Sequence, residues 1–285
     1  MTLSTVLTAV AILAGVGLTF AGLIALTHRK FKVWEDPRID VVAGMLPGAN
    51  CGACGQPGCR AFAELLVAGS VPPAGCNVMS DERIAEVAQF LGVAAGEANR
   101  RVARLLCAGG RDVALQQAEY LGLATCKAAA AVAGGGKACA WGCLGLADCE
   151  RACDFGAITM NGQDLPVVAP ALCTACGDCV AACPKDLFTL MPVEQKLIVQ
   201  CRSWLEGDAI QAVCKVACTA CGKCVADAAP GLIRIANGLA VVDYDRNTLA
   251  SPAATARCPT GAIVWVEGAQ FAPAQRTDVR EMVVA

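Results

Sequence analysis

The sequence CTACGDCVAACPKD at residues 173–186 returns at residues 218–231 as CTACGKCVADAAPG. The two copies begin alike, but the first ends in Cys183 followed by proline, whereas the second has Ala228 in that place. In bacterial ferredoxins the run C-x2-C-x2-C-x3-C-P binds iron–sulfur clusters, and its fourth cysteine ligates the other cluster of a pair. The spacing therefore predicts a cluster-binding loop in each copy. Only the first copy has the fourth cysteine that would ligate a neighbouring cluster.

The first copy predicts one complete cluster. Cys173, Cys176 and Cys179 form the local loop, so the fourth ligand must come from elsewhere in the chain. Cys153 is the candidate because it lies in CDFGAI, which resembles the CPxxAI ending of a ferredoxin motif with Asp154 in place of proline.

A partner cluster is expected to take Cys183 as its remote ligand and Cys143 and Cys149 from its own loop. Its third local position holds Leu146, and Cys139 is the nearest upstream thiol that could replace the missing one. A vestigial half without this cluster is the alternative interpretation.

The block that follows resembles the first one, since Cys139, Cys143 and Cys149 align with Cys214, Cys218 and Cys224. The segment at 243–263 has no cysteine triplet and keeps a single cysteine before proline. One cluster has therefore been lost together with all its ligands, while the remote ligand of the other has been kept. The surviving cluster is predicted on Cys218, Cys221, Cys224 and Cys258.

The amino-terminal cysteines form a different pattern, C-x2-C-x4-C-x16-C, among several glycines that let the backbone turn tightly. The spacing favours an iron–sulfur cluster, and a tetrahedral zinc site is the alternative. The predicted ligands are Cys51, Cys54, Cys59 and Cys76. The remaining cysteines are expected to be small buried hydrophobic residues: Cys107, Cys126, Cys201 and Cys214.

Residues 3–27 contain no charged side chain, and about 20 such residues suffice to cross a bilayer as a helix. A cleaved signal peptide is the alternative, but no charged region precedes the apolar run. The sequence HRKFK at 28–32 follows the span, which predicts that the rest of the chain is cytoplasmic. Cytosolic thiols stay reduced, so the 20 cysteines indicate metal binding rather than disulfides.

The net charge of −2 and the absence of a long basic run argue against nucleic-acid binding. No GxGxxG fingerprint follows a predicted strand, so the chain is expected to carry electrons rather than to bind NAD. The fold class expected is α+β, with short helices after the cluster loops, a helix that starts at the N-cap candidate Ser80 and a small hairpin from Leu232 to Val242. The predicted order is an anchor (1–28), a linker (29–48), an N-terminal cluster domain (49–80), a helical spacer (81–106), a two-cluster ferredoxin-like domain (107–192), a degenerate one-cluster ferredoxin-like domain (193–268) and a loosely held tail (269–285).

Four features follow one another along the chain: one apolar anchor, LPGANCGACGQPGC, GGKACAWGCLGLADCERACDFGAI and CTACGDCVAACPK. In this order they resemble the B subunit of Rnf electron-transport complexes, and the resemblance covers nearly the whole chain. The resemblance implies a single-pass subunit in the bacterial inner membrane, with lipid and the other subunits of the complex as partners. It implies transfer of electrons between soluble ferredoxin or flavodoxin and NAD, coupled to ion movement. Four [4Fe–4S] clusters are expected, fewer than in a chain with a complete last domain. A ferredoxin-type subunit of another membrane oxidoreductase and a structural zinc module are the alternatives.

Overall fold

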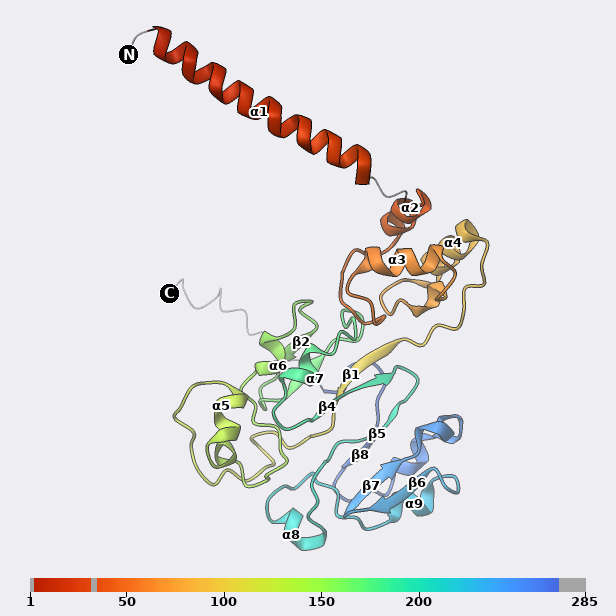
Figure 1. The fold of residues 1–285 in the computed structure, drawn as a ribbon. Coiled ribbons are helices and arrows are strands. Elements are labelled where there is room, and N and C mark those ends of the chain that lie inside the picture. Colours follow the sequence, from red (N-terminus) through yellow and green to blue (C-terminus); the bar gives the residue numbers. More distant parts are fainter. Residues whose placement is uncertain (1–2, 32–34, 272–285) are drawn as a thin grey trace, which may run out of the picture.

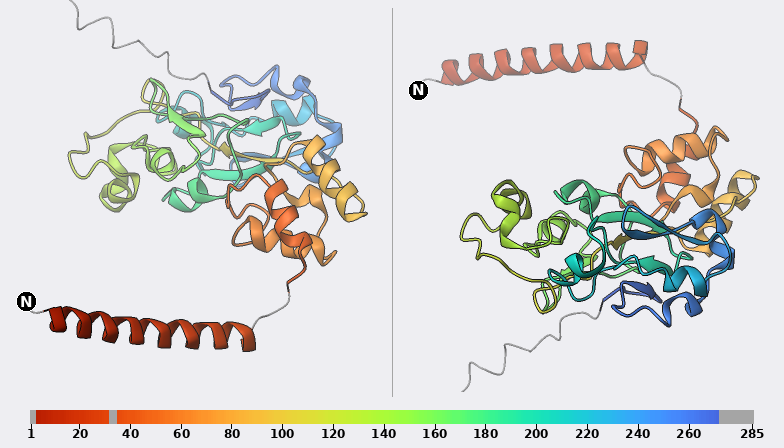
Figure 2. Two further views of the ribbon diagram at one scale, coloured as in Figure 1. Left: turned by 90° about the horizontal axis from the view of Figure 1, so that it is seen from above. Right: turned by 90° about the horizontal axis from the view of Figure 1, so that it is seen from below.

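The computed structural model describes residues 3–31 and 35–271, so residues 32–34 of the predicted linker and 272–285 of the predicted tail lie outside it. Helix α1 (Leu3–Phe31) lies apart from the remaining domains (Figures 1 and 2). Its segment Leu7–Phe31 has a mean hydropathy of 2.4 and is not buried. Within it, the hydroxyl of Thr19 donates to the carbonyl of Gly15 at 2.8 Å, which satisfies that polar group inside the helix. The helix is long and apolar enough to cross a membrane.

The N-terminal domain consists of α2 (Arg38–Met45), α3 (Cys59–Val67), η1 (Pro73–Gly75) and α4 (Asp81–Leu91), packed on a core that includes Val42, Leu66 and Val87. Helix α4 begins where the sequence predicts, because the side chain of Ser80 accepts the Arg83 N–H at 3.3 Å. It ends at Gly92, whose φ of 68° is the left-handed conformation that favours glycine.

The helical spacer predicted for 81–106 is wrong at its end, because Arg101–Leu105 form strand β1. This strand pairs antiparallel with β4 (Phe188–Pro192), with Leu105 opposite Phe188. Val102, Ala103 and Leu105 are each 1% exposed. Pairing with a strand more than 80 residues away, and burial on both faces, outweigh the local helical spacing of the apolar residues.

The first ferredoxin-like repeat follows β1. It contains α5 (Cys126–Ala131), η2 (Ala133–Gly136), α6 (Asp148–Arg151), the hairpin of β2 (Ile158–Met160) and β3 (Pro166–Val168), α7 (Asp178–Ala182) and β4. Short helices occur at the cysteine loops, but α6 and α7 each begin one residue before the last local cysteine, Cys149 or Cys179, rather than after the loop as predicted. Each is preceded by a residue in the left-handed conformation, Ala147 and Gly177, at which the loop turns into the helix.

The second repeat contains β5 (Leu197–Val199), α8 (Gly207–Gln211), α9 (Lys223–Asp227), β6 (Ile233–Ala236), β7 (Leu239–Val242), η3 (Tyr244–Leu249), η4 (Pro252–Thr255) and β8 (Ile263–Trp265). The β6–β7 hairpin confirms the hairpin predicted at 232–242. All the sheets among the described residues are two-stranded, and helices and strands are mixed throughout (Figure 1).

The two repeats correspond strand by strand. The outer ladder β1–β4 of the first is matched by β5–β8 of the second, and the pair Leu105–Phe188 occupies the same ladder position as Val199–Ile263. The hairpin β2–β3 is matched by β6–β7. Over most of the repeat, equivalent residues are 75 positions apart, as with Phe188 and Ile263. This correspondence allows cysteines in the two repeats to be compared by position in the fold.

Candidate iron–sulfur sites

The amino-terminal cysteines surround one cavity, which is also lined by Leu46 and Phe62. The loop before α3 turns through Gly52 and Gly55, at φ of 72° and 78°. Its end is fixed by Asn50, whose Oδ1 accepts the N–H of Cys59 at 2.8 Å. The four predicted ligands therefore face a common space: Cys51, Cys54, Cys59 and Cys76.

A second cavity lies between β1, β4 and the β2 strand, with apolar walls that include Ala103, Ile158 and Leu190. It is lined by all the cysteines that the sequence assigns to the first middle cluster: Cys153, Cys173, Cys176 and Cys179. The N–H of Ala157 donates to the Sγ of Cys153 at 3.3 Å. Burial, with Cys173 and Cys176 as neighbours, raises the pKa of the Cys179 thiol to about 12. Binding of a positive group such as iron would favour loss of this proton.

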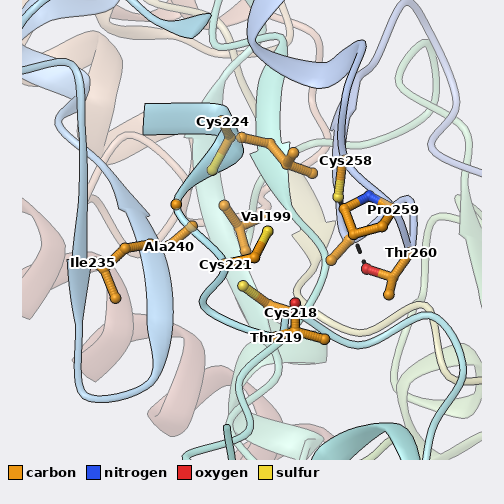
Figure 3. Close-up of a pocket in the computed structure, with 13 residues that line it drawn as sticks. Val199, Cys218, Thr219, Cys221, Cys224, Ile235, Ala240, Cys258, Pro259 and Thr260 are labelled. Carbon is orange, nitrogen blue, oxygen red and sulfur yellow. Dashed lines mark hydrogen bonds between the residues drawn. The ribbon is translucent and has the colours of Figure 1, made fainter. Parts of the chain in front are cut away.

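A third cavity lies in the second repeat (Figure 3). Cys218 and Cys221 come from the loop before α9, Cys224 from the helix itself, and Cys258 from the far side of the hollow, next to Pro259. Burial opposes ionisation of Cys258, but the N–H groups of Ile263 and Thr260 stabilise the thiolate and lower its pKa. The local triplet and the remote cysteine thus face one another across the cavity.

A further group of thiols gathers around α6, with one member that the sequence did not predict. Cys149 lies within electrostatic range of Cys126 and Cys183, and burial raises its pKa to about 12. Cys143 lies within range of Cys149. The sulfur of Cys126 accepts N–H groups of Asp148 and Leu146, so it lies over the stretch of backbone that lacks a cysteine of its own.

Local hydrogen bonds fix Cys126 in this place. It is the first residue of α5, and the side chain of Thr125 caps that helix by accepting the Ala128 N–H at 3.1 Å. Oδ2 of Asp148 accepts the Lys127 N–H at 2.9 Å, which ties the start of α5 to the start of α6. The N-cap threonine was a sequence signal for a helix beginning at Cys126, but nothing local indicated where that helix would dock.

Cys139 does not join this group as the sequence predicted. Its neighbours are Cys107 and, through Cys214, the second repeat. The physical reason lies in the backbone: the N–H of Ala138 donates to the carbonyl of Leu115 at 2.9 Å, which holds this segment against a different part of the chain. The prediction of Cys139 as the substitute ligand thus differs from the arrangement in the fold.

The separation of the thiols helps to distinguish a zinc site from an iron–sulfur cluster. Within residues 3–31 and 35–271, no three Cys, His, Asp or Glu side chains converge as they would around a single metal ion. Tetrahedral zinc, with Zn–S bonds of about 2.3 Å, would bring its sulfurs to within about 4 Å of one another. Four thiols around a hollow fit the larger [4Fe–4S] core better.

Comparison with known proteins points to an iron–sulfur protein. Residues 46–78 match a family model described as a putative Fe–S cluster. Over 86% of its length the chain is 42% identical to the B subunit of the Na⁺-translocating ferredoxin:NAD⁺ oxidoreductase complex of Acetobacterium woodii, of which it covers 73%. It is 38% identical to the B subunit of an ion-translocating oxidoreductase complex of Methanosarcina acetivorans, over 91% of this chain and 98% of that one.

A third relative is the B subunit of the proton-translocating ferredoxin:NAD⁺ oxidoreductase complex of Clostridium ljungdahlii, 39% identical over 92% of this chain and 93% of the relative. These similarities extend across the N-terminal domain and both repeats rather than one motif. The chain therefore belongs to the family of B subunits of ion-translocating oxidoreductase complexes, the Rnf family.

Proposed function

We propose that this chain is the membrane-anchored electron relay of an Rnf-type complex, passing electrons at the cytoplasmic face between soluble ferredoxin or flavodoxin and the subunits that react with NAD. The observation that carries the proposal is the recurrence of cavities lined by four cysteines, two of them with three local thiols and one remote thiol. Ion translocation, proton or sodium, belongs to the complex as a whole.

The proposed ligands of four [4Fe–4S] clusters follow the groups described above. They are Cys51, Cys54, Cys59 and Cys76; Cys153, Cys173, Cys176 and Cys179; Cys126, Cys143, Cys149 and Cys183; and Cys218, Cys221, Cys224 and Cys258. Cys126 here takes the place that the sequence analysis gave to Cys139. Bound clusters supply one-electron chemistry. The protein supplies buried thiols, the N–H donors that stabilise them and apolar walls that limit water access.

The orientation in the membrane rests on the basic residues after the apolar helix, of which His28, Arg29 and Lys30 occupy the last turn of α1. A cytoplasmic location keeps the cysteines reduced and accessible to soluble donors. Protease added to sealed, right-side-out cells should leave the cysteine domains intact. Digestion of these domains from outside would reverse the orientation.

NAD is proposed to react elsewhere in the complex, because the sequence lacks a GxGxxG fingerprint after a strand. The deciding experiment uses the full chain in detergent, reconstituted with iron and sulfide without oxygen. Reduced ferredoxin or flavodoxin should reduce its clusters, seen as bleaching of the visible absorption, while NADH alone should not. Zinc in place of iron, or clusters that accept no electrons from either donor, would overturn the proposal.

A further inference from the structure

After these assignments, the cysteines that remain are Cys107, Cys139, Cys201 and Cys214. Each side chain is less than a tenth exposed. They come from distant parts of the chain, and although Cys139 and Cys214 align between the repeats, the sequence indicates no spacing that would bring all four together. The fold nevertheless brings them into one region between the two repeats.

Backbone pairing joins the segments that carry them. The N–H of Ala108 donates to the carbonyl of Gln200 at 3.1 Å, so the residues next to Cys107 and Cys201 are bonded. Ala114 forms a β-bridge with Cys214, and Leu115 accepts the N–H of Ala138, next to Cys139. Cys107 is consequently within electrostatic range of each of the other three thiols.

Gly109 leaves space among these sulfurs. A Cβ at this residue would lie 3.2 Å from the Sγ of Cys214 and 3.6 Å from the Sγ of Cys107. Any side chain here would therefore intrude between two thiols. A positive charge is also near: the ammonium of Lys137 donates to the carbonyls of Gly109 and Cys143, both at 2.5 Å. A buried group of thiolates needs such a counter-charge.

The four cysteines also occupy equivalent places in the two repeats. Cys107 is the second residue after Leu105, which pairs with Phe188, and Cys201 is the second residue after Val199, which pairs with Ile263. The residue between is bonded alike in both: the Leu106 N–H donates to Leu187, and the Gln200 N–H donates to Ala262. The other two cysteines each stand four residues before the first cysteine of a cluster loop.

We propose that Cys107, Cys139, Cys201 and Cys214 hold a fifth [4Fe–4S] cluster in the interface between the repeats, each repeat contributing two thiolates. Isolated buried cysteines would have no reason to occupy paired positions around a gap kept open by glycine. With this site, five groups of four account for all 20 cysteines of the chain. The thiols do not converge as around a single ion, which favours a cluster over zinc.

The location suggests a role that rests on the proposed electron relay. The N–H of Cys143 donates to the Sγ of Cys107 at 3.4 Å, and the N–H of Cys218 donates to the sulfur of Cys201. The site therefore contacts a proposed cluster ligand in each repeat, Cys143 in the first and Cys218 in the second. A cluster here would form the step by which electrons cross from one repeat to the other.

Native mass spectrometry of the full chain in detergent, reconstituted without oxygen, would count the clusters. Five Fe₄S₄ units are expected for the wild type, and four for Cys139→Ala/Cys214→Ala with the spectra of the other clusters retained. Gly109→Ala should lower occupancy of the fifth site, whereas Gly162→Ala, in open space, should leave five.

Four clusters in the wild type, or four clusters and one zinc ion, would overturn the fifth site even if the double variant failed to fold. Fewer than four would instead count against the proposed relay. A wild type with five clusters, together with a double variant that also keeps five, would overturn the ligand assignment.

Discussion

The two ferredoxin-like repeats share the same strand pairing but differ in the number of cysteine groups that they contain. The first repeat has thiols for two clusters on its own cysteines, and the second for one. Positions that carry Cys153, Cys173, Cys176 and Cys179 in the first correspond to Ala228, Thr248, Ser251 and Ala254 in the second. The second repeat places the 3₁₀ segments η3 and η4 where the first has a cysteine loop and helix.

In the η3–η4 region, buried apolar side chains occupy the place of the cysteine loop. Ala254 is 1% exposed, and the hydroxyl of the half-buried Tyr244 donates to the carbonyl of Leu197 at 3.0 Å, which ties η3 to β5. The comparison teaches that apolar contacts and a hydrogen bond can fill the place of a proposed cluster while the flanking ladders keep their register. What such a repeat cannot lose is Cys258, because that thiol lines the same cavity as Cys218, Cys221 and Cys224, where the remaining cluster is proposed.

Substitution of the remote ligands, Cys258 and Cys183, is expected to have the largest effect on iron content and to remove a different cluster in each case. Cys258→Ala should remove the cluster at Cys218, Cys221 and Cys224, with a loss of about four iron atoms per chain. Cys183→Ala should instead remove the cluster of Cys149 and spare the one formed by the local triplet just before it in sequence. Electron paramagnetic resonance of the reduced variants, cluster by cluster, checks both. Unchanged spectra for Cys258→Ala would show that the second repeat is not built in this way.

Two substitutions test whether Cys126 replaces the ligand that is missing at Leu146. Cys126→Ala should remove the cluster shared by Cys143, Cys149 and Cys183, since its sulfur lies over Leu146 and Asp148. Adding Leu146→Cys restores the ferredoxin spacing seen at Cys221 in the second repeat, and should recover about four iron atoms. Cys139→Ala is the matched control, expected to leave this cluster's signal in place. If Cys139→Ala removes the signal and Cys126→Ala does not, the original sequence prediction is restored.

The sequence predicts those ligands that follow the ferredoxin spacing, including its remote cysteine, and fails where docking of segments without such a spacing brings thiols together. The triplets, the pairing of Cys258 with its distant loop, the start of α4 and the β6–β7 hairpin follow from spacing, an N-cap and alternation. Cys126 could not be placed because the docking of α5 depends on Asp148, 22 residues later. The equivalence of Cys107 and Cys201 is visible only in strand register, since they precede their cluster loops by different distances.

A smaller difference between the repeats lies in the charge beside the proposed Cys173 cluster and at the equivalent place in the second repeat. Arg104 is 1% exposed, within electrostatic range of Cys173, and its Nε has no hydrogen-bond partner among the described residues. The equivalent residue in the second repeat is Ile198, which is fully buried. A buried cation favours the reduced, more negative form of a cluster.

Arg104→Leu should therefore make the potential of the Cys173 cluster more negative, by an amount on the order of tens of millivolts. The cluster proposed on Cys218, Cys221, Cys224 and Cys258, whose cavity is not lined by Arg104, should keep its potential and serves as the internal reference. Redox titration followed by electron paramagnetic resonance measures both in one sample. A shift of equal size at both clusters would mean that the arginine acts through the fold as a whole. Arg104→Lys, which keeps the charge, should shift the potential less.

The smallest effect is expected from returning a cysteine to the second repeat. Ala228→Cys recreates the complete C-x2-C-x2-C-x3-C run, yet this thiol would serve a partner cluster whose other positions are Thr248, Ser251 and Ala254. Since the last of these is buried in packed side chains, no space exists for iron there. Iron content, the spectrum of the Cys258 cluster and the melting temperature should all stay close to wild type. Four additional iron atoms in Ala228→Cys would mean that the second repeat still holds a cluster cavity, and that its packing is less complete than the burial of Ala254 indicates.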